Sequence, residues 1–134
     1  MNWTRFGLAV LASGILMSLS DWVFMGILFH DKYKQYPEVW RDPPGTSETP
    51  KILYSTLMGF VSAVAFTYLA FQCNFETYEA TLKLAAAIWI IGPLPLIISN
   101  ALWIKFPKEL AASHSLGWLV KLCIIAVIYR AILK

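Results

Sequence analysis

Four long apolar stretches constrain the fold of this chain more than any other feature. They cover residues 6–29, 52–71, 82–104 and 110–133. A helix needs about 20 mostly apolar residues to cross a hydrocarbon core of about 30 Å. Lipid offers the backbone no hydrogen bonds, and a helix pairs its own N–H and C=O groups. The sequence therefore predicts an all-α protein, a bundle of four transmembrane helices that forms one integral membrane domain over residues 1–134.

The composition agrees with a membrane protein. The chain is 58% hydrophobic and 14% charged, whereas a soluble domain is about 45–50% apolar and about 25% charged. A soluble domain of 134 residues could not hide so much apolar surface, because small domains bury the smallest fraction of theirs. We therefore expect a multi-pass membrane protein whose main partner is the lipid bilayer.

The segments between the apolar stretches differ in length. Residues 72–81 and 105–112 are short, so helices that follow one another should be antiparallel neighbours. Residues 31–51 form the longest polar loop, which is rich in Pro and aromatic residues. Two structures fit this loop: a short interfacial helix followed by an extended stretch, or an ordered cap over one end of the bundle. Pro93 and Pro95 should kink the third helix.

Charge and cysteine content exclude several classes of protein. The net charge is +3 and the basic residues are scattered, so no nucleic-acid partner is expected. Lys and Arg are somewhat more frequent in the first and third loops, which favours both termini on the outer side. The apolar run after Arg5 resembles a secretory signal, but it resumes after Asp21 and reaches spanning length. Cys73 and Cys123 form no disulfide framework or metal motif.

Asp21 and Lys121 are the ionisable residues deepest within the apolar stretches. A charged side chain in the bilayer costs about 2.5–3.5 kcal/mol even on the mildest scales, and it usually faces the bundle interior. At 1.5 Å per residue, Asp21 lies about 12 Å from the first-loop side, and Lys121 lies about 10–16 Å from the same side. We therefore expect the two side chains to pair, directly or through water. Such a pair can also serve only to fix how the helices pack.

Other polar and aromatic side chains fall at similar levels of the bundle. They suggest a polar pocket that opens to the first-loop side and is capped by residues 31–51, rather than a continuous pore. His30 and His114 lie near that side, but they lack the spacing of a metal-binding motif. They are therefore weak candidates for metal ligands, and neither a metal nor a cofactor is expected. The candidate binding residues are Asp21, Lys121, Ser99, Asn100, His114, Trp118 and Trp22, and the weak metal candidates are His30 and His114.

Short motifs occur in order along the whole chain. They are Trp22, Phe29, Lys32 and Tyr33, then Leu94-Pro95, Asn100, Leu102-Trp103, Pro107 and Gly117-Trp118. In these motifs the chain resembles the bacterial membrane family called domain-of-unknown-function family 1761. The resemblance implies a small four-helix protein of the bacterial inner membrane, and it implies no particular activity.

Three hypotheses of function follow. The first is a protein whose one-sided pocket around Asp21 and Lys121 binds or transports a small solute, ion or proton. Because four helices enclose little volume, a homo-oligomer is one form that this protein could take. The second is a structural or regulatory subunit of a larger membrane complex. The third is a membrane-embedded enzyme acting on a lipid or quinone. No catalytic motif is present, so enzymatic activity is the least expected.

Overall fold

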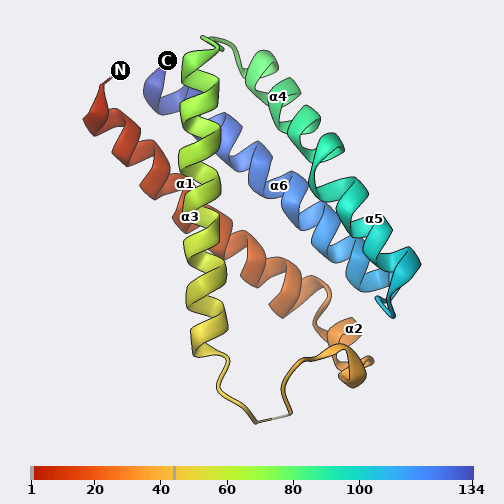
Figure 1. The fold of residues 1–134 in the computed structure, drawn as a ribbon. Coiled ribbons are helices and arrows are strands. Elements are labelled where there is room, and N and C mark those ends of the chain that lie inside the picture. Colours follow the sequence, from red (N-terminus) through yellow and green to blue (C-terminus); the bar gives the residue numbers. More distant parts are fainter. Residues whose placement is uncertain (1, 44) are drawn as a thin grey trace.

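The computed structural model describes residues 2–43 and 45–134, and all of its regular elements are helices, with no strand in those residues (Figure 1). The elements are α1 (Trp3–Val23), the π-helix η1 (Phe24–Leu28), α2 (His30–Lys34), the 3₁₀-helix η2 (Pro37–Val39), α3 (Thr49–Gln72), α4 (Tyr78–Ile91), α5 (Pro93–Trp103) and α6 (Lys108–Leu133). Four helical segments are long and apolar enough to cross a membrane: Trp3–Leu28, Thr49–Gln72, Tyr78–Trp103 and Lys108–Leu133. The prediction of an all-α chain with four spanning helices is confirmed.

The four spans run alternately up and down (Figure 1). Both chain ends lie at one end of the molecule, which we call the terminal end. The described residues of the first connection, 29–43 and 45–48, and residues 104–107 lie at the opposite end, which we call the loop end. The helix α6 is central, because it packs against α1, α4, α5 and α3, while α3 packs mainly on α1. This arrangement places α1 and α6, the helices that carry Asp21 and Lys121, side by side.

Local sequence signals explain where the helices begin and end. The side chain of Asn2 accepts a hydrogen bond of 3.1 Å from the backbone N–H of Arg5 at the start of α1. The hydroxyl of Thr77 accepts one of 3.1 Å from the N–H of Ala80 at the start of α4. Asn74 has a positive φ of 53° and follows α3, as residues that end a helix in the left-handed conformation do.

The third span is broken at Gly92, directly before Pro93. Pro93 and Pro95 have no backbone N–H, so the carbonyl groups four residues before them lose their usual helical donors. The N–H of Gly92 still donates to the oxygen of Ile88 at 3.0 Å, and Gly92 closes α4 while α5 begins at Pro93. The kink that the two prolines predict therefore appears as two shorter helices, α4 and α5.

The first span changes its winding near the loop end. Residues Phe24–Leu28 form a π-helix, in which the N–H of Phe29 donates to the oxygen of Phe24 at 2.9 Å. A π-helical turn holds more residues than an α-helical turn, so it rotates the side chains that follow, and such turns are frequent at functional sites. Gly26 lies against the Trp22 ring, and a Cβ added at Gly26 would lie 3.2 Å from the nearest atom of that ring. The sequence did not predict this turn.

The buried core lies in the terminal half of the bundle. Its residues include Met17 of α1, Phe66 of α3, and Ile125 of α6. Three hydroxyl-bearing side chains are also completely buried there, and their oxygens have no hydrogen-bond partner among the described residues: Ser13, Thr67 and Tyr129. The terminal half is therefore less uniformly apolar than the sequence suggests.

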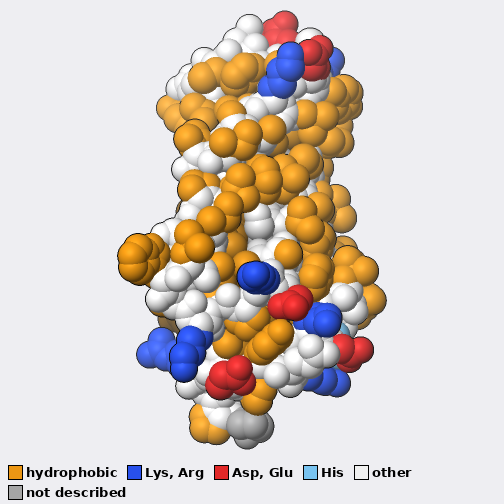
Figure 2. Space-filling view, turned by 90° about the vertical axis from the view of Figure 1, so that its right-hand side faces the viewer, with side chains coloured by type: hydrophobic (Ala, Val, Ile, Leu, Met, Phe, Trp, Pro, Cys, Tyr) orange, Lys and Arg blue, Asp and Glu red, His pale blue; other side chains and the backbone are white. Residues whose placement is uncertain are grey.

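The surface has the polarity that a membrane requires. On the face drawn in Figure 2, hydrophobic side chains form a broad band below a small group of charged side chains at the terminal end. Charged side chains extend much farther from the loop end towards the middle of the molecule. The asymmetry agrees with a polar site in the loop half of the bundle.

The crossing of α1 and α3 provides a first prediction. Gly14 lies so close to Phe60 that an added Cβ would stand 2.2 Å from a ring atom, whereas a Cβ at Gly7 would meet nothing within 4 Å. Gly14→Leu should therefore lower the free energy of unfolding by about 1–3 kcal/mol through overpacking. The matched variant Gly7→Leu should leave the free energy of unfolding nearly unchanged. Unfolding of both variants in mixed micelles checks this, and equal losses would contradict the close crossing.

Candidate functional site

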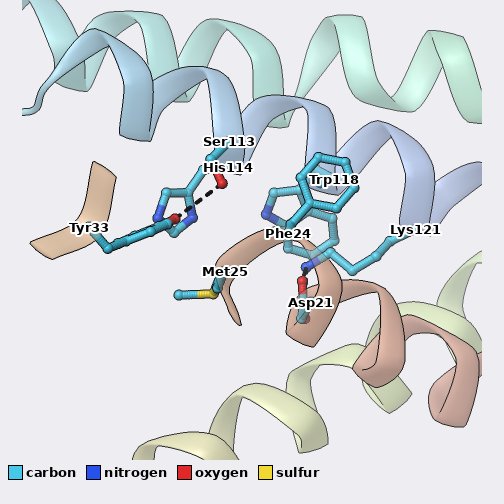
Figure 3. Close-up of a pocket in the computed structure, with 9 residues that line it drawn as sticks. Asp21, Phe24, Met25, Tyr33, Ser113, His114, Trp118 and Lys121 are labelled. Atoms are coloured by element: carbon cyan, nitrogen blue, oxygen red, sulfur yellow. Dashed lines mark hydrogen bonds and ion pairs between the residues drawn. The ribbon is translucent and has the colours of Figure 1, made fainter. Parts of the chain in front are cut away.

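An ion pair joins the first and last spans. The Nζ atom of Lys121 lies 2.9 Å from Oδ1 of Asp21 and donates to Oδ2 at 3.2 Å (Figure 3). The Lys121 side chain is 13% exposed and that of Asp21 is 37% exposed. Asp21 precedes the end of its span at Leu28 by about 10 Å, at 1.5 Å per residue. The two opposite charges expected to meet inside the bundle do lie together, in its loop half.

The indole of Trp118 is the second partner of the ammonium group. Nζ of Lys121 lies 4.2 Å from the centroid of the Trp118 ring, one turn earlier on α6. A cation over the face of an indole is attracted by the ring quadrupole, by about 2 kcal/mol when the pair is desolvated. Lys121 is thus held between a carboxylate and an aromatic face.

A small cavity lies between the ion pair and the loop end (Figure 3). Its volume is about 20 Å³, which is room for about one water molecule. Polar side chains of α1, α6 and α2 line the cavity. The lining residues are Asp21, Phe24, Met25, Tyr33, Ser113, His114, Gly117, Trp118 and Lys121. The cavity is a water-sized polar site rather than a vestibule for a larger solute.

The cavity is covered by the segment that contains α2 and η2. The Tyr33 hydroxyl donates to Oγ of Ser113 at 3.3 Å, and the Tyr33 ring meets the His114 ring edge-on at 6.0 Å. The indole N–H of Trp40 donates to the backbone oxygen of Tyr33 at 3.2 Å. The Tyr36 hydroxyl donates to Oε2 of Glu109 at 3.2 Å. The first loop therefore contains both a short helix and an ordered cap, which the sequence offered as alternatives.

Tyr33 gives this cap a pH dependence. Burial raises the pKa of the Tyr33 hydroxyl, and the charge of Asp21 raises it further, while the hydrogen bond to Ser113 lowers it. A raised pKa means that the stabilisation is complete below the ordinary tyrosine pKa of about 10 and is lost as the pH rises through the folded value. The cap should therefore loosen only in strongly alkaline solution.

This loosening can be followed through Trp40, whose ring centroid lies 5.5 Å from that of Tyr33. In a protein with Trp40 as its sole tryptophan, the emission should change in an alkaline step. The step should disappear in Tyr33→Phe, which should also lose about 1 kcal/mol of stability at neutral pH with its hydrogen bond. An unchanged alkaline step in that variant would show that Tyr33 does not hold the cap.

The structure brings together only some of the candidate residues. Asp21, Lys121, His114 and Trp118 all line the cavity. Trp22 is 63% exposed and lies outside it, because the residue after Asp21 points to another face of α1. Ser99 and Asn100 are exposed on α5, which buries Ile97 instead. His30 is exposed on α2. These four residues lie outside the lining of the cavity.

Five lining residues were not among the candidates: Phe24, Met25, Tyr33, Ser113 and Gly117. Ser113 and Gly117 precede Lys121 at intervals of four residues, so a helical-face analysis of α6 could have included them. Phe24 and Met25 follow Asp21 by three and four residues, so they share its helical face and could have been included in the same way.

The metal candidates find no support in the arrangement of ligands. Among residues 2–43 and 45–134, no three or more His, Cys, Asp or Glu side chains are grouped so that they could hold a metal ion. His114 instead packs between the rings of Tyr33 and Phe106, with centroid distances of 6.0 and 5.6 Å. In this structure, His114 is part of the cavity wall beneath the cap.

Comparison with known proteins identifies the family. No curated protein and no solved structure matches the chain. The model of one family, described as "Protein of unknown function (DUF1761)", matches residues 8–130. The match includes the Asp21–Lys121 pair and nearly all of the four spans. With four helices able to cross a membrane and a match over most of its length, this chain belongs to the DUF1761 family.

Proposed function

We propose that this protein takes up and releases a proton at Asp21, from the loop side of the membrane, with Lys121 as the counter-charge. The observation that carries the proposal is the position of the Lys121 ammonium group. It lies between the Asp21 carboxylate and the Trp118 ring, inside a membrane span and next to a water-sized polar cavity. Ionisable residues inside a membrane often form proton relays.

The size of the cavity distinguishes between the solutes that a polar pocket could handle. A volume of about 20 Å³ admits about one water molecule. A larger solute would need the cap and the helices to move apart. A proton needs only a chain of hydrogen-bonding groups, and one water next to the carboxylate supplies that. The geometry therefore supports a proton better than an organic solute.

The chemistry of the proposed step is a simple acid–base reaction. A proton from water at the loop end adds to a carboxylate oxygen of Asp21, and the pair changes from neutral to a charge of +1. The Lys121 ammonium then loses its anionic partner. Its long flexible stem allows it to move towards the membrane interface, and release of the proton restores the pair. Proton uptake is thereby coupled to a movement of Lys121 relative to Trp118.

Trp118 can report this movement. In a protein with Trp118 as the sole tryptophan, reconstituted in lipid nanodiscs, the indole emission should change in one step as the pH is lowered. Asp21→Asn should abolish the step. The matched control Asp42→Asn removes a carboxylate that pairs with Lys51 near the start of α3, and it should leave the step unchanged. A step that persists in Asp21→Asn, or no step in the parent protein, would refute the proposal.

A further inference from the structure

We infer that a groove between α3, α4–α5 and α6 is a binding site for a single lipid acyl chain. The groove has a volume of about 220 Å³ and is separate from the polar cavity. Its walls are formed by Ser62, Ala65, Phe66 and Leu69 of α3, by Ile88 and Pro93 of the broken third span, and by Trp118 and Leu122 of α6. It exists because α3 packs on α1 and α6, while α4 and α5 pack on α6.

The chemistry of the groove selects an apolar occupant. Ser62 carries the one polar side chain of the lining apart from the Trp118 indole. The Ser62 hydroxyl already donates to the backbone oxygen of Met58 at 3.0 Å. An ordered water needs two to four polar partners, and an apolar cavity stays dry. A hydrocarbon chain has no such requirement, so it can fill the groove without leaving a polar group unpaired.

Depth identifies the hydrocarbon as the tail of a lipid. Ser62 lies about 20 Å from the start of α3 at Thr49 and about 15 Å from its end at Gln72, at 1.5 Å per residue. Pro93 lies near the middle of the third span, Tyr78–Trp103. The groove is therefore near the midplane of the bilayer, which lipid headgroups do not reach and acyl chains occupy.

Size distinguishes an acyl chain from a helix of another protein. An α-helix with its side chains is about 10–12 Å across, which is too thick for a groove of about 220 Å³. An unbranched chain is thin enough to enter beside the Gly92–Pro93 break. A single large side chain from a second copy would also fit by volume, so the experiment must separate the two.

Trp118 connects the groove with the ion pair. The same indole lines the groove and the polar cavity, and it carries the Lys121 ammonium group at 4.2 Å. A chain in the groove would therefore contact the ring that holds Lys121. Trp118 is also the natural reporter, because bromine atoms on an acyl chain quench an indole only when they touch it.

The experiment uses the full chain with Trp118 as the sole tryptophan, in nanodiscs of phosphatidylcholine brominated at the middle of the chain. We expect strong quenching relative to the unbrominated lipid. Ala65→Phe fills the groove with an aromatic ring and should therefore remove most of the quenching. The matched control Val64→Phe changes the neighbouring residue, which is 45% exposed and outside the groove, and it should leave the quenching unchanged.

Two results would overturn the inference. One is equal quenching in Ala65→Phe and in the parent, which would mean that the bromines reach Trp118 by another route. The other is weak quenching that increases when the protein is diluted in lipid, which would mean that a second copy fills the groove. The quenching should persist in Asp21→Asn. The result of the quenching experiment is therefore independent of the proposed proton uptake at Asp21.

Discussion

Lys121→Met and Asp21→Asn should each lower the free energy of unfolding by about 2–3 kcal/mol, the cost of leaving one unpaired charge in hydrocarbon. The double variant should recover most of that loss, because it removes both charges and leaves side chains of similar shape. This non-additivity is expected of two groups in direct contact, and they lie 2.9 Å apart here. Reversible unfolding in mixed micelles measures all four proteins of the cycle.

The chain offers a matched control for this cycle in the ion pair between Asp42 and Lys51. That pair lies near the start of α3 and its side chains are 32% and 51% exposed. Asp42→Asn and Lys51→Met should therefore change stability by less than about 1 kcal/mol each. If the losses from Asp21→Asn and Lys121→Met simply add in the double variant, the two side chains do not interact in the membrane.

Trp118→Ala should lower the free energy of unfolding at least as much as the loss of either charge. The indole separates the polar cavity from the apolar groove and faces the Lys121 ammonium group. Its removal would join the two spaces, remove the cation–π partner and expose the ammonium to hydrocarbon. We expect a loss of about 2–4 kcal/mol, from lost packing together with the lost cation–π attraction.

Trp118→Phe keeps an aromatic face beneath the ammonium group and should recover about half of this loss. Trp103→Ala is the matched control, because Trp103 is 85% exposed, and it should be nearly neutral. The same unfolding measurement in mixed micelles applies. A loss for Trp118→Ala no larger than that for Trp103→Ala would show that the indole does not hold the ion pair.

The sequence predicts the spans and the depth of the charges well, because both depend only on counting residues along a helix. Asp21 and Lys121 lie at similar depths by the rise per residue, and the structure has them in contact. The same reasoning predicts Ser99 and Asn100 near the site, but both lie outside the lining of the cavity. The helix α5 buries Ile97, and both Ser99 and Asn100 are exposed.

The remaining parts of the site depend on tertiary packing. The π-helical turn over Phe24–Leu28, at the edge of the cavity, has no signature in the local sequence. Tyr33 reaches Ser113 across 80 residues of chain, so a loop rich in aromatic residues could suggest a cap but not its contacts. Trp22 directly follows Asp21 in the sequence, but it points to a different face of α1 and lies outside the lining of the cavity.

Isotope-edited infrared spectroscopy of the aspartate carboxyl groups can show whether Asp21 takes up a proton. The chain has only three aspartates, Asp21, Asp31 and Asp42, so ¹³C-labelled aspartate makes the spectrum simple enough to assign with Asp21→Asn. In lipid bilayers, we expect the Asp21 carboxylate band to convert to a protonated carboxyl band as the pH falls, and we expect Lys121→Met to alter this conversion. An Asp21 signal that does not respond to pH, or that is the same with and without Lys121, would contradict the proposed proton uptake at Asp21.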